Sequence, residues 1–265
     1  MPAADRSARR LLLLGGTREA AALARLLDEC WGARLDLVSS LAGRTERPGA
    51  LPGAVRIGGF GGADGLARYL REAAIDLLID ATHPFAARIA AHAHTAAEAA
   101  AVPRLKLLRP PWRRDPLDRW IEVENVEAAA AVLPRVGKRA FLSLGSQDIG
   151  AFAGLDGFFL LRTVDPLRDA PPFADYRALT GRGPFSAAGE EALLRAHRIA
   201  VLVSRASGGA DTEGKILAAR RLGLPVVMIR RPAPLPGPRV ESIEEAAEWV
   251  AAHLETGEER QAWRA

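Results

Sequence analysis

The 265-residue sequence predicts an α/β protein of two lobes, each built around a parallel β-sheet. Short apolar runs alternate with alanine-rich, helix-like stretches along the whole chain, which is the pattern of βα units. Three prolines within residues 109–116 interrupt that rhythm, because neither a helix nor a central strand continues through them. We therefore expect one lobe over residues 1–110, a second over 111–265, and an active-site cleft between them.

The first lobe is predicted to hold five strands and three helices. Residues 11–14 are four leucines, which is too uniformly apolar for a half-exposed strand and indicates a central strand buried on both faces. A helix with alanine and leucine at helical spacing follows at 19–29. The other elements are strands at 34–39, 54–58, 76–80 and 104–107, and helices at 63–74 and 84–100.

Beyond the prolines the same alternation restarts. Ser186 is a candidate N-cap for the helix that follows it. Pro232 to Pro238 is a proline-rich connector, and Thr256–Ala265 is a polar tail that we expect to be mobile. The predicted strands are 120–123, 139–144, 158–162, 199–204 and 225–229, and the predicted helices are 126–133, 147–152, 187–197, 212–222 and 243–254.

Composition narrows the class of protein. Hydrophobic residues make up 49% and charged residues 26%, as in globular domains. The net charge is only +4 and the arginines are scattered, so no nucleic-acid partner is expected. Cys30 is the only cysteine, which excludes a disulfide scaffold and favours the cytoplasm. No stretch approaches the ~18 apolar residues of a membrane span, so no membrane partner is expected.

Residues 11–19 read LLLLGGTRE and take the buried strand through two glycines into a helix. Backbone N–H groups at such a helix start attract phosphate, and glycine lets the phosphate approach closely. Gly15, Gly16 and Thr17 are therefore candidate nucleotide-binding residues. A plain strand-to-helix turn, with Thr17 as the cap, is the alternative.

The end of the second strand indicates which nucleotide is bound. NAD-binding lobes place a carboxylate there to hold the ribose 2′-hydroxyl, whereas this chain has Ser39, Ser40 and Arg44. Hydroxyls and a guanidinium suit a 2′-phosphate, which favours NADPH as the cofactor. The alternative is an ordinary polar loop with a solvated arginine.

At the end of the fourth strand, residues 80–85 read DATHPF. Ligands of open α/β sheets lie beyond the carboxyl ends of the strands, so Asp80 and Thr82 are candidate cofactor-binding residues and His83 is a candidate catalytic residue. Pro84 is expected as the first helical residue. For a lone histidine, capping or packing is the alternative. No histidine pair has the spacing of a helical zinc site, so no metal is expected.

The second lobe has its own candidate loop. Residues 204–216, SRASGGADTEGKI, follow a strand and lead into a helix. Two glycines flanked by hydroxyls, with a basic residue on either side, suit an anion. The alternative is a turn in which Asp211 or Thr212 merely caps the next helix. The candidate substrate-binding residues are Arg205, Ser207, Gly208, Gly209, Thr212 and Lys215.

In combination these motifs resemble the precorrin-6A reductase family. The segments LGGT, SLAGR, DATHPFA, RPPW, GPFS and SGGADTEGKI occur in the family's order and span about residues 11–231. The resemblance implies two Rossmann-like lobes and an NADPH-dependent oxidoreductase of cobalamin biosynthesis. Such an enzyme reduces one macrocycle double bond of precorrin-6A, or cobalt-precorrin-6A, to give precorrin-6B. This chain departs from the family pattern at Arg205-Ala206, where many members have Lys-Asn.

The resemblance also implies residue roles. The substrate carries many acetate and propionate carboxylates, and these would account for Arg109, Arg205 and Lys215. The ring nitrogens of the macrocycle could accept charge themselves. If a protein group donates the proton, His83 is the first candidate, since imidazole titrates near neutrality, and Lys215 is the other candidate catalytic residue.

Other functions fit the same architecture. One group is enzymatic: another two-lobe NADP-dependent reductase, or a nucleotide-sugar transferase. The other is a non-catalytic nucleotide sensor or tetrapyrrole carrier. In each case we expect a monomer or a small homo-oligomer.

Overall fold

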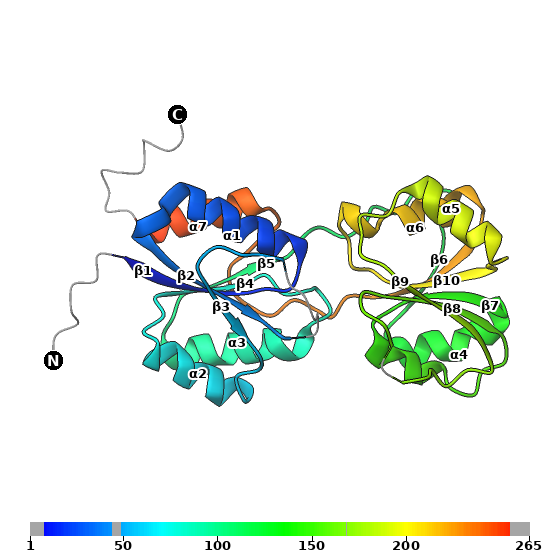
Figure 1. Cartoon of the computed structure of the whole chain (residues 1–265), viewed down its shortest axis with the longest axis horizontal. Helices are drawn as coiled ribbons and strands as arrows, with labels where there is room; N and C mark the ends of the chain where they lie inside the picture. The colour runs from blue at the N-terminus through cyan, green and yellow to red at the C-terminus, as the bar shows by residue number, and fades with distance from the viewer. Residues whose placement is uncertain (1–7, 44–48, 168, 255–265) are drawn as a thin grey trace. The chain divides into compact units, whose positions relative to one another are not determined.

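The computed structural model describes residues 8–43, 49–167 and 169–254. They form two compact units, of which unit 1 comprises Met1–Arg109 with Ala233–Ala265 and unit 2 comprises Pro110–Pro232. Each unit contains a six-stranded parallel sheet with helices on both faces (Figure 1). The predicted α/β class with parallel sheets is confirmed.

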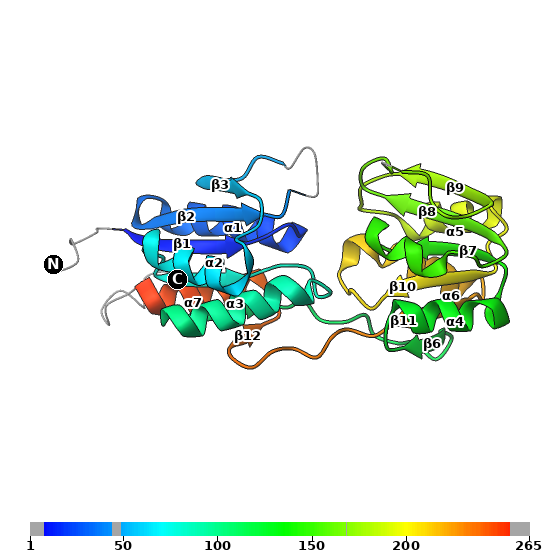
Figure 2. The ribbon, with the colours of Figure 1, turned by 90° about the horizontal axis from the view of Figure 1, so that it is seen from below.

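The unit 1 sheet has the strand order β12-β5-β4-β1-β2-β3, and Figure 2 shows β3 and β12 at its opposite edges. One face is covered by α1 (Arg18–Trp31) and α7 (Ile243–Leu254), the other by α2 (Gly62–Glu72) and α3 (Ala87–Ala100) (Figure 1). The strands are β1 (Arg9–Leu14), β2 (Leu35–Leu41), β3 (Ala54–Ile57), β4 (Leu77–Asp80), β5 (Arg104–Leu107) and β12 (Arg239–Val240).

The four leucines of β1 sit at the centre of the unit 1 core. Leu11 and Leu13 pack with α1 and α7, and Leu12 and Leu14 pack with α2 and α3. None of the four is more than 2% exposed. Burying such a side chain contributes about 1.5–3 kcal/mol. The predicted central strand, buried on both faces, is confirmed.

Unit 2 repeats the pattern with the strand order β6-β11-β10-β7-β8-β9. Helices α5 (Ala187–Ala196) and α6 (Gly214–Arg221) cover one face and α4 (Val126–Val136) the other (Figure 1). Short 3₁₀ helices are η1 (Gly32–Arg34) in unit 1, and η2 (Ser146–Phe152) and η3 (Ala210–Thr212) in unit 2. The strands are β6 (Arg119–Val123), β7 (Arg139–Ser143), β8 (Phe158–Thr163), β9 (Asp175–Thr180), β10 (Val201–Arg205) and β11 (Pro225–Ile229).

The end of the chain differs from the sequence prediction. Residues 233–254 lie in unit 1 and not with residues 111–232. The reason is pairing and packing: β12 pairs with β5, and α7 inserts Ala246 and Val250 into the core beside α1. The unit 1 sheet thus takes its sixth strand from a distant part of the chain. The tail at Thr256–Ala265 lies outside the described residues.

Two strands are absent from the sequence prediction, and both form sheet edges. The residues of β9 are almost all exposed, so they show no apolar alternation. The other, β12, is two residues long. Ser186 does cap α5, since its side chain accepts a hydrogen bond from the Gly189 N–H. No helix of the described residues is long and apolar enough to cross a bilayer.

An ion pair just before β6 makes the stability of unit 2 pH-dependent. Arg220 Nε and Nη2 donate to the buried Asp118 carboxylate at 2.9 and 3.0 Å. Burial raises the pKa of Asp118, but hydrogen bonds from Arg220 and the Asp115 N–H, with the charges of Arg220 and Arg114, leave it below its usual 3.8. Because the folded-state pKa lies below this usual value of 3.8, the ion pair stabilises unit 2 at pH values above 3.8. The stabilisation is lost as the pH falls through the folded-state pKa.

We therefore expect Asp118→Asn to destabilise the protein most at neutral pH. The difference in unfolding free energy between wild type and variant should shrink as the pH falls below about 4. Urea unfolding across a pH series measures this difference. A difference that stays constant into the acid range would contradict the role of the ion pair.

Candidate functional site: the carboxyl edge of the unit 1 sheet

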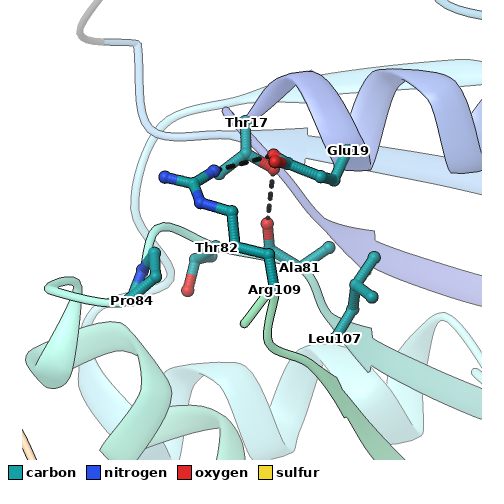
Figure 3. Close-up of a pocket in the computed structure, with 7 residues that line it drawn as sticks. All are labelled: Thr17, Glu19, Ala81, Thr82, Pro84, Leu107 and Arg109. Atoms are coloured by element: carbon teal, nitrogen blue, oxygen red, sulfur yellow. Dashed lines mark hydrogen bonds and ion pairs between the residues drawn. The ribbon is translucent and has the colours of Figure 1, made fainter. Parts of the chain in front are cut away.

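Strands β1, β4 and β5 end at one edge of the unit 1 sheet, where the strand order reverses between β1 and β4. That reversal is the usual ligand position of an open parallel sheet. A small pocket lies there (Figure 3). It is lined by Thr17, Glu19, Ala81, Thr82, Pro84, Leu107 and Arg109.

The two-glycine turn leads from β1 into α1. The Gly15 N–H donates to the Ser40 carbonyl at 2.9 Å, which fixes the turn on β2. Gly16 has a φ of +104°, which an L side chain rarely adopts, and a Cβ there would meet nothing within 4 Å. Thr17 caps α1 by accepting from the Ala20 N–H, and it donates to the Ala81 carbonyl at 2.9 Å. The turn is therefore both a cap and an open approach to the N-terminus of α1.

Asp80 forms a buried cluster with Thr82 and Lys106. Asp80 Oδ1 accepts from the Thr82 N–H at 3.0 Å, the Thr82 hydroxyl at 2.6 Å and Lys106 Nζ at 2.9 Å. Lys106 Nζ also reaches the Thr82 carbonyl at 3.2 Å. Asp80 is fully buried, yet its Oδ2 has no hydrogen-bond partner within the described part of the chain. A buried acceptor of this kind is costly unless something completes it.

These features fit a dinucleotide. The N-terminus of α1 offers backbone N–H groups and a positive dipole end to a pyrophosphate, with an open approach at Gly16. Asp80 Oδ2 has capacity for one more donor close to that edge. The residues predicted from the Gly15–Thr17 turn and from the Asp80 segment are therefore brought to the same edge of one sheet.

The serines predicted near a 2′-phosphate lie within β2 and not in an exposed loop. Ser39 is 1% exposed and Ser40 is 6% exposed. The Ser39 hydroxyl is buried and has no hydrogen-bond partner among the described residues. Arg44 lies outside the described residues. The role of these residues in cofactor binding stays a prediction.

His83 stands in a tight turn before α3. The Ala86 N–H donates to the His83 carbonyl at 2.8 Å, and the Phe85 N–H donates to His83 Nδ1 at 3.2 Å. The helix begins at Ala87, so Pro84 is not its first residue, and that prediction is wrong. Proline instead occupies the second position of a turn, which its fixed φ suits. Because Nδ1 accepts a hydrogen bond, the neutral ring carries its proton on Nε2.

Arg109 ends the first segment of unit 1, Met1–Arg109, and it is held to the first turn of α1. Its Nη1 lies 2.8 Å from Glu19 Oε2, and Figure 3 shows the two side chains joined beside Thr17. The guanidinium side chain is 15% exposed. Both residues of this ion pair line the pocket.

The predicted loop of unit 2 follows β10 and is tightly packed. Gly208 has a φ of +64°, and a Cβ there would lie 2.1 Å from the Pro110 carbonyl oxygen. The Gly209 carbonyl accepts from the Trp112 indole N–H at 3.0 Å, and the Ser207 carbonyl accepts from Arg231 at 2.8 Å. This packing by itself requires glycine at 208.

The basic residues of that loop also have partners inside unit 2. Arg205 forms an ion pair with Asp148 of η2, at the carboxyl end of β7. Lys215 is 4% exposed, and its Nζ donates to the Thr212 carbonyl at 3.0 Å and lies 5.1 Å from the Trp112 ring centroid. The substrate and catalytic roles predicted for these residues stay predictions.

Three residues of these sites are missing from the sequence prediction: Glu19, Lys106 and Asp148. For Lys106 a signal exists, because it lies one residue before the end of a strand adjacent to that of Asp80. The acidic partners lie 90 and 57 residues from their arginines, which no local pattern reveals. Among the described residues, no group of three or more His, Cys, Asp or Glu side chains is placed to hold a metal ion.

Known proteins resemble most of this chain. A family model described as precorrin-6x reductase CbiJ/CobK matches residues 10–251. The precorrin-6A reductase of Rhodococcus erythropolis is 48% identical, covering 91% of this chain and 96% of its own length. A solved structure, "CobK precorrin-6A reductase", matches with a TM-score of 0.87 at 42% identity, covering 94% and 99% of the two chains. The cobalt-precorrin-6A reductase of Salmonella typhimurium is 30% identical over 85% of this chain and 88% of its own. The chain therefore belongs to the precorrin-6x reductase CbiJ/CobK family and is an oxidoreductase of cobalamin biosynthesis.

Proposed function

We propose that this oxidoreductase reduces one macrocycle double bond of precorrin-6A to give precorrin-6B, with NADPH as the reductant. The observation that carries the proposal is the carboxyl edge of the unit 1 sheet. There an open glycine turn, a helix N-terminus and a buried Asp80 with one unpaired oxygen lie together. The loop after β10 is the second candidate for anion binding, and we assign it to the carboxylates of the substrate.

Residues of unit 1 would hold the cofactor. The N–H groups at the start of α1 would bind the pyrophosphate, with Gly16 leaving the approach open. Asp80 Oδ2 would accept a hydrogen bond from the cofactor, while Lys106 keeps Oδ1 in place. Ser40 and Arg44 would lie towards the 2′-phosphate, as the sequence predicts. When bound, NADPH supplies a hydride to the macrocycle, and the neighbouring carbon takes up a proton.

Arg109 and Arg205 would bind substrate carboxylates by giving up their present ion pairs with protein carboxylates. Arg109 and Arg205 are paired with Glu19 and Asp148, so a substrate carboxylate has to compete with a protein carboxylate at each. A pair held in this way keeps the guanidinium oriented without leaving a buried charge alone. Since a relative named for precorrin-6A has 48% identity and one named for the cobalt form 30%, we propose the metal-free substrate.

His83 is the proposed proton donor. His83 follows β4 at the carboxyl edge of the unit 1 sheet, where Asp80 ends that strand, and its Nε2 carries the proton of the neutral ring. Replacing His83 with Ala is expected to lower the single-turnover rate of substrate reduction by about 100-fold, which is the usual contribution of a general acid. His92→Ala, on α3, is the matched control. Rapid-mixing absorbance of NADPH measures both rates, and a His83→Ala rate within about twofold of wild type would remove His83 from the chemistry.

The function itself is tested by NADPH oxidation with precorrin-6A and cobalt-precorrin-6A supplied separately. We expect oxidation with the metal-free substrate, at a higher kcat/KM than with the cobalt form. Binding of NADPH with no oxidation in the presence of either substrate would indicate a sensor. Tight binding of a UDP-sugar in place of NADPH would indicate a transferase. Either result would overturn the proposal.

A further inference from the structure

A second pocket of unit 1 lies at the amino end of β5, away from the site described above. Its volume is about 370 Å³, which is within the range of small-molecule sites. Arg104 is the first residue of β5, whereas Lys106, which contacts Asp80, lies towards its carboxyl end. The pocket is lined by the second half of α3, the turn before β5, and residues 236–238 of the segment that enters from unit 2.

The pocket contains a buried arginine without an acidic partner. Arg104 is 9% exposed. Its Nη2 donates to the Pro236 carbonyl at 2.6 Å and lies 3.4 Å from His94 Nδ1. No carboxylate oxygen of the described residues lies within 4.0 Å of its guanidinium nitrogens. Two partly buried arginines elsewhere in the described chain do have one: Arg162 pairs with Glu190, and Arg220 pairs with Asp118.

This difference matters because burying a lone charge is expensive, and buried charges are normally paired. A carbonyl oxygen offsets only part of the cost. The guanidinium has five N–H donors, and the two contacts above are both made by Nη2. Its remaining donors are suited to a fork-shaped acceptor with two oxygens.

The neighbours of Arg104 set the size and charge of the pocket. Arginine only donates, so His94 Nδ1 must be the acceptor, and the ring then carries its proton on Nε2, 3.5 Å from Glu98 Oε1. Glu98 is 69% exposed and can turn away into solvent. Gly237 lines the pocket without a side chain, and a Cβ there would lie 3.1 Å from Arg104 Nη2.

We propose that this Arg104 pocket binds an oxyanion, a phosphate or carboxylate group of a small metabolite, which pairs with Arg104. His94 contributes a second polar contact, and Glu98 is displaced because its charge opposes the ligand. The bound anion also fixes Pro236, whose segment continues into β12. This site is separate from the proposed NADPH site, and neither depends on the other.

The test is hydrogen–deuterium exchange of the full chain with and without millimolar inorganic phosphate or citrate as probes. The chain is saturated with NADP⁺ throughout, so that the proposed cofactor site at the start of α1 is already occupied. We expect added protection over residues 94–108 and 236–240 with at least one probe. A titration of that protection gives an affinity for each variant. No change at these residues with either probe would overturn the proposal.

Variants locate the anion on Arg104. We expect Arg104→Gln to weaken binding about tenfold or more, the usual effect of losing a charge-assisted hydrogen bond. Arg119→Gln is the matched control, since Arg119 also begins a strand and donates to a backbone carbonyl, that of Gly223, and it should change binding less than twofold. If Arg104→Gln does not fold, Glu98→Gln decides the matter. It removes an exposed opposing charge and should tighten binding; unchanged or weaker binding would contradict the proposal.

Discussion

Lys106→Met is expected to destabilise unit 1 by about 3–5 kcal/mol, the usual cost of breaking a buried ion pair by removing one partner. Asp80 is fully buried and Lys106 is 14% exposed, so little water is present to replace the lost ammonium. The carboxylate would keep only the two donors of Thr82. The same change should weaken NADPH binding, because Lys106 holds the carboxylate that we assign to the cofactor.

Urea unfolding measures the stability term, and a double-mutant cycle isolates it. Asp80→Asn with Lys106→Met should be less destabilised than the sum of the two single variants, because no charge is then left alone. Lys138→Met is the control, since Lys138 is exposed and its removal should change stability by less than about 0.5 kcal/mol. If Lys106→Met is as mild as Lys138→Met, the buried cluster does not stabilise the site.

Gly208→Ala is expected to abolish most of the reductase activity while leaving NADPH affinity unchanged. The position needs a φ of +64°, and the added Cβ would lie 2.1 Å from the Pro110 oxygen and 2.5 Å from Arg231 Nη2. The loop after β10 therefore has to move. If that loop holds the substrate, kcat/KM should fall about tenfold or more, through KM in particular. The proposed cofactor site is in unit 1 and does not include this loop.

Gly223→Ala separates the effect of the positive φ from the effect of the clash with Pro110. Gly223 has nearly the same φ, +63°, but a Cβ there meets nothing within 4 Å. It carries the conformational cost of about 1–2 kcal/mol without the clash. We expect it to lower stability slightly and to leave kcat/KM near the wild-type value. Equal losses of kcat/KM in both variants would show that contact with Pro110 is not what shapes the loop.

Local patterns predicted most of the elements, including those whose residues are buried. The leucines of β1 and the Ser186 cap are examples, because apolar continuity and capping are properties of neighbouring residues. They did not predict β9, whose exposed residues show no pattern. Nor did they place β12 and α7 in unit 1. The residues of these two elements carry no pattern that indicates pairing with β5 and not with a strand of unit 2.

In the candidate site, too, contiguous motifs could be predicted, whereas contacts between distant residues could not. The glycine turn and the DATHPF segment could be found from sequence, because each is contiguous and ends a buried strand. The partners of Arg109 and Arg205 could not, since Glu19 and Asp148 are distant in the chain and meet them only after both sheets form. The partner of Asp80 was less hidden, because Lys106 lies near the end of a predicted strand, although the sequence does not state that this strand is adjacent to that of Asp80.

The most direct test of the central claim is hydrogen–deuterium exchange of the full chain with and without saturating NADP⁺. If the carboxyl edge of the unit 1 sheet holds the cofactor, protection should appear over residues 15–21 at the start of α1 and over 80–87. Residues 205–213 should exchange as before. Protection over 205–213, with none at the start of α1, would contradict the account.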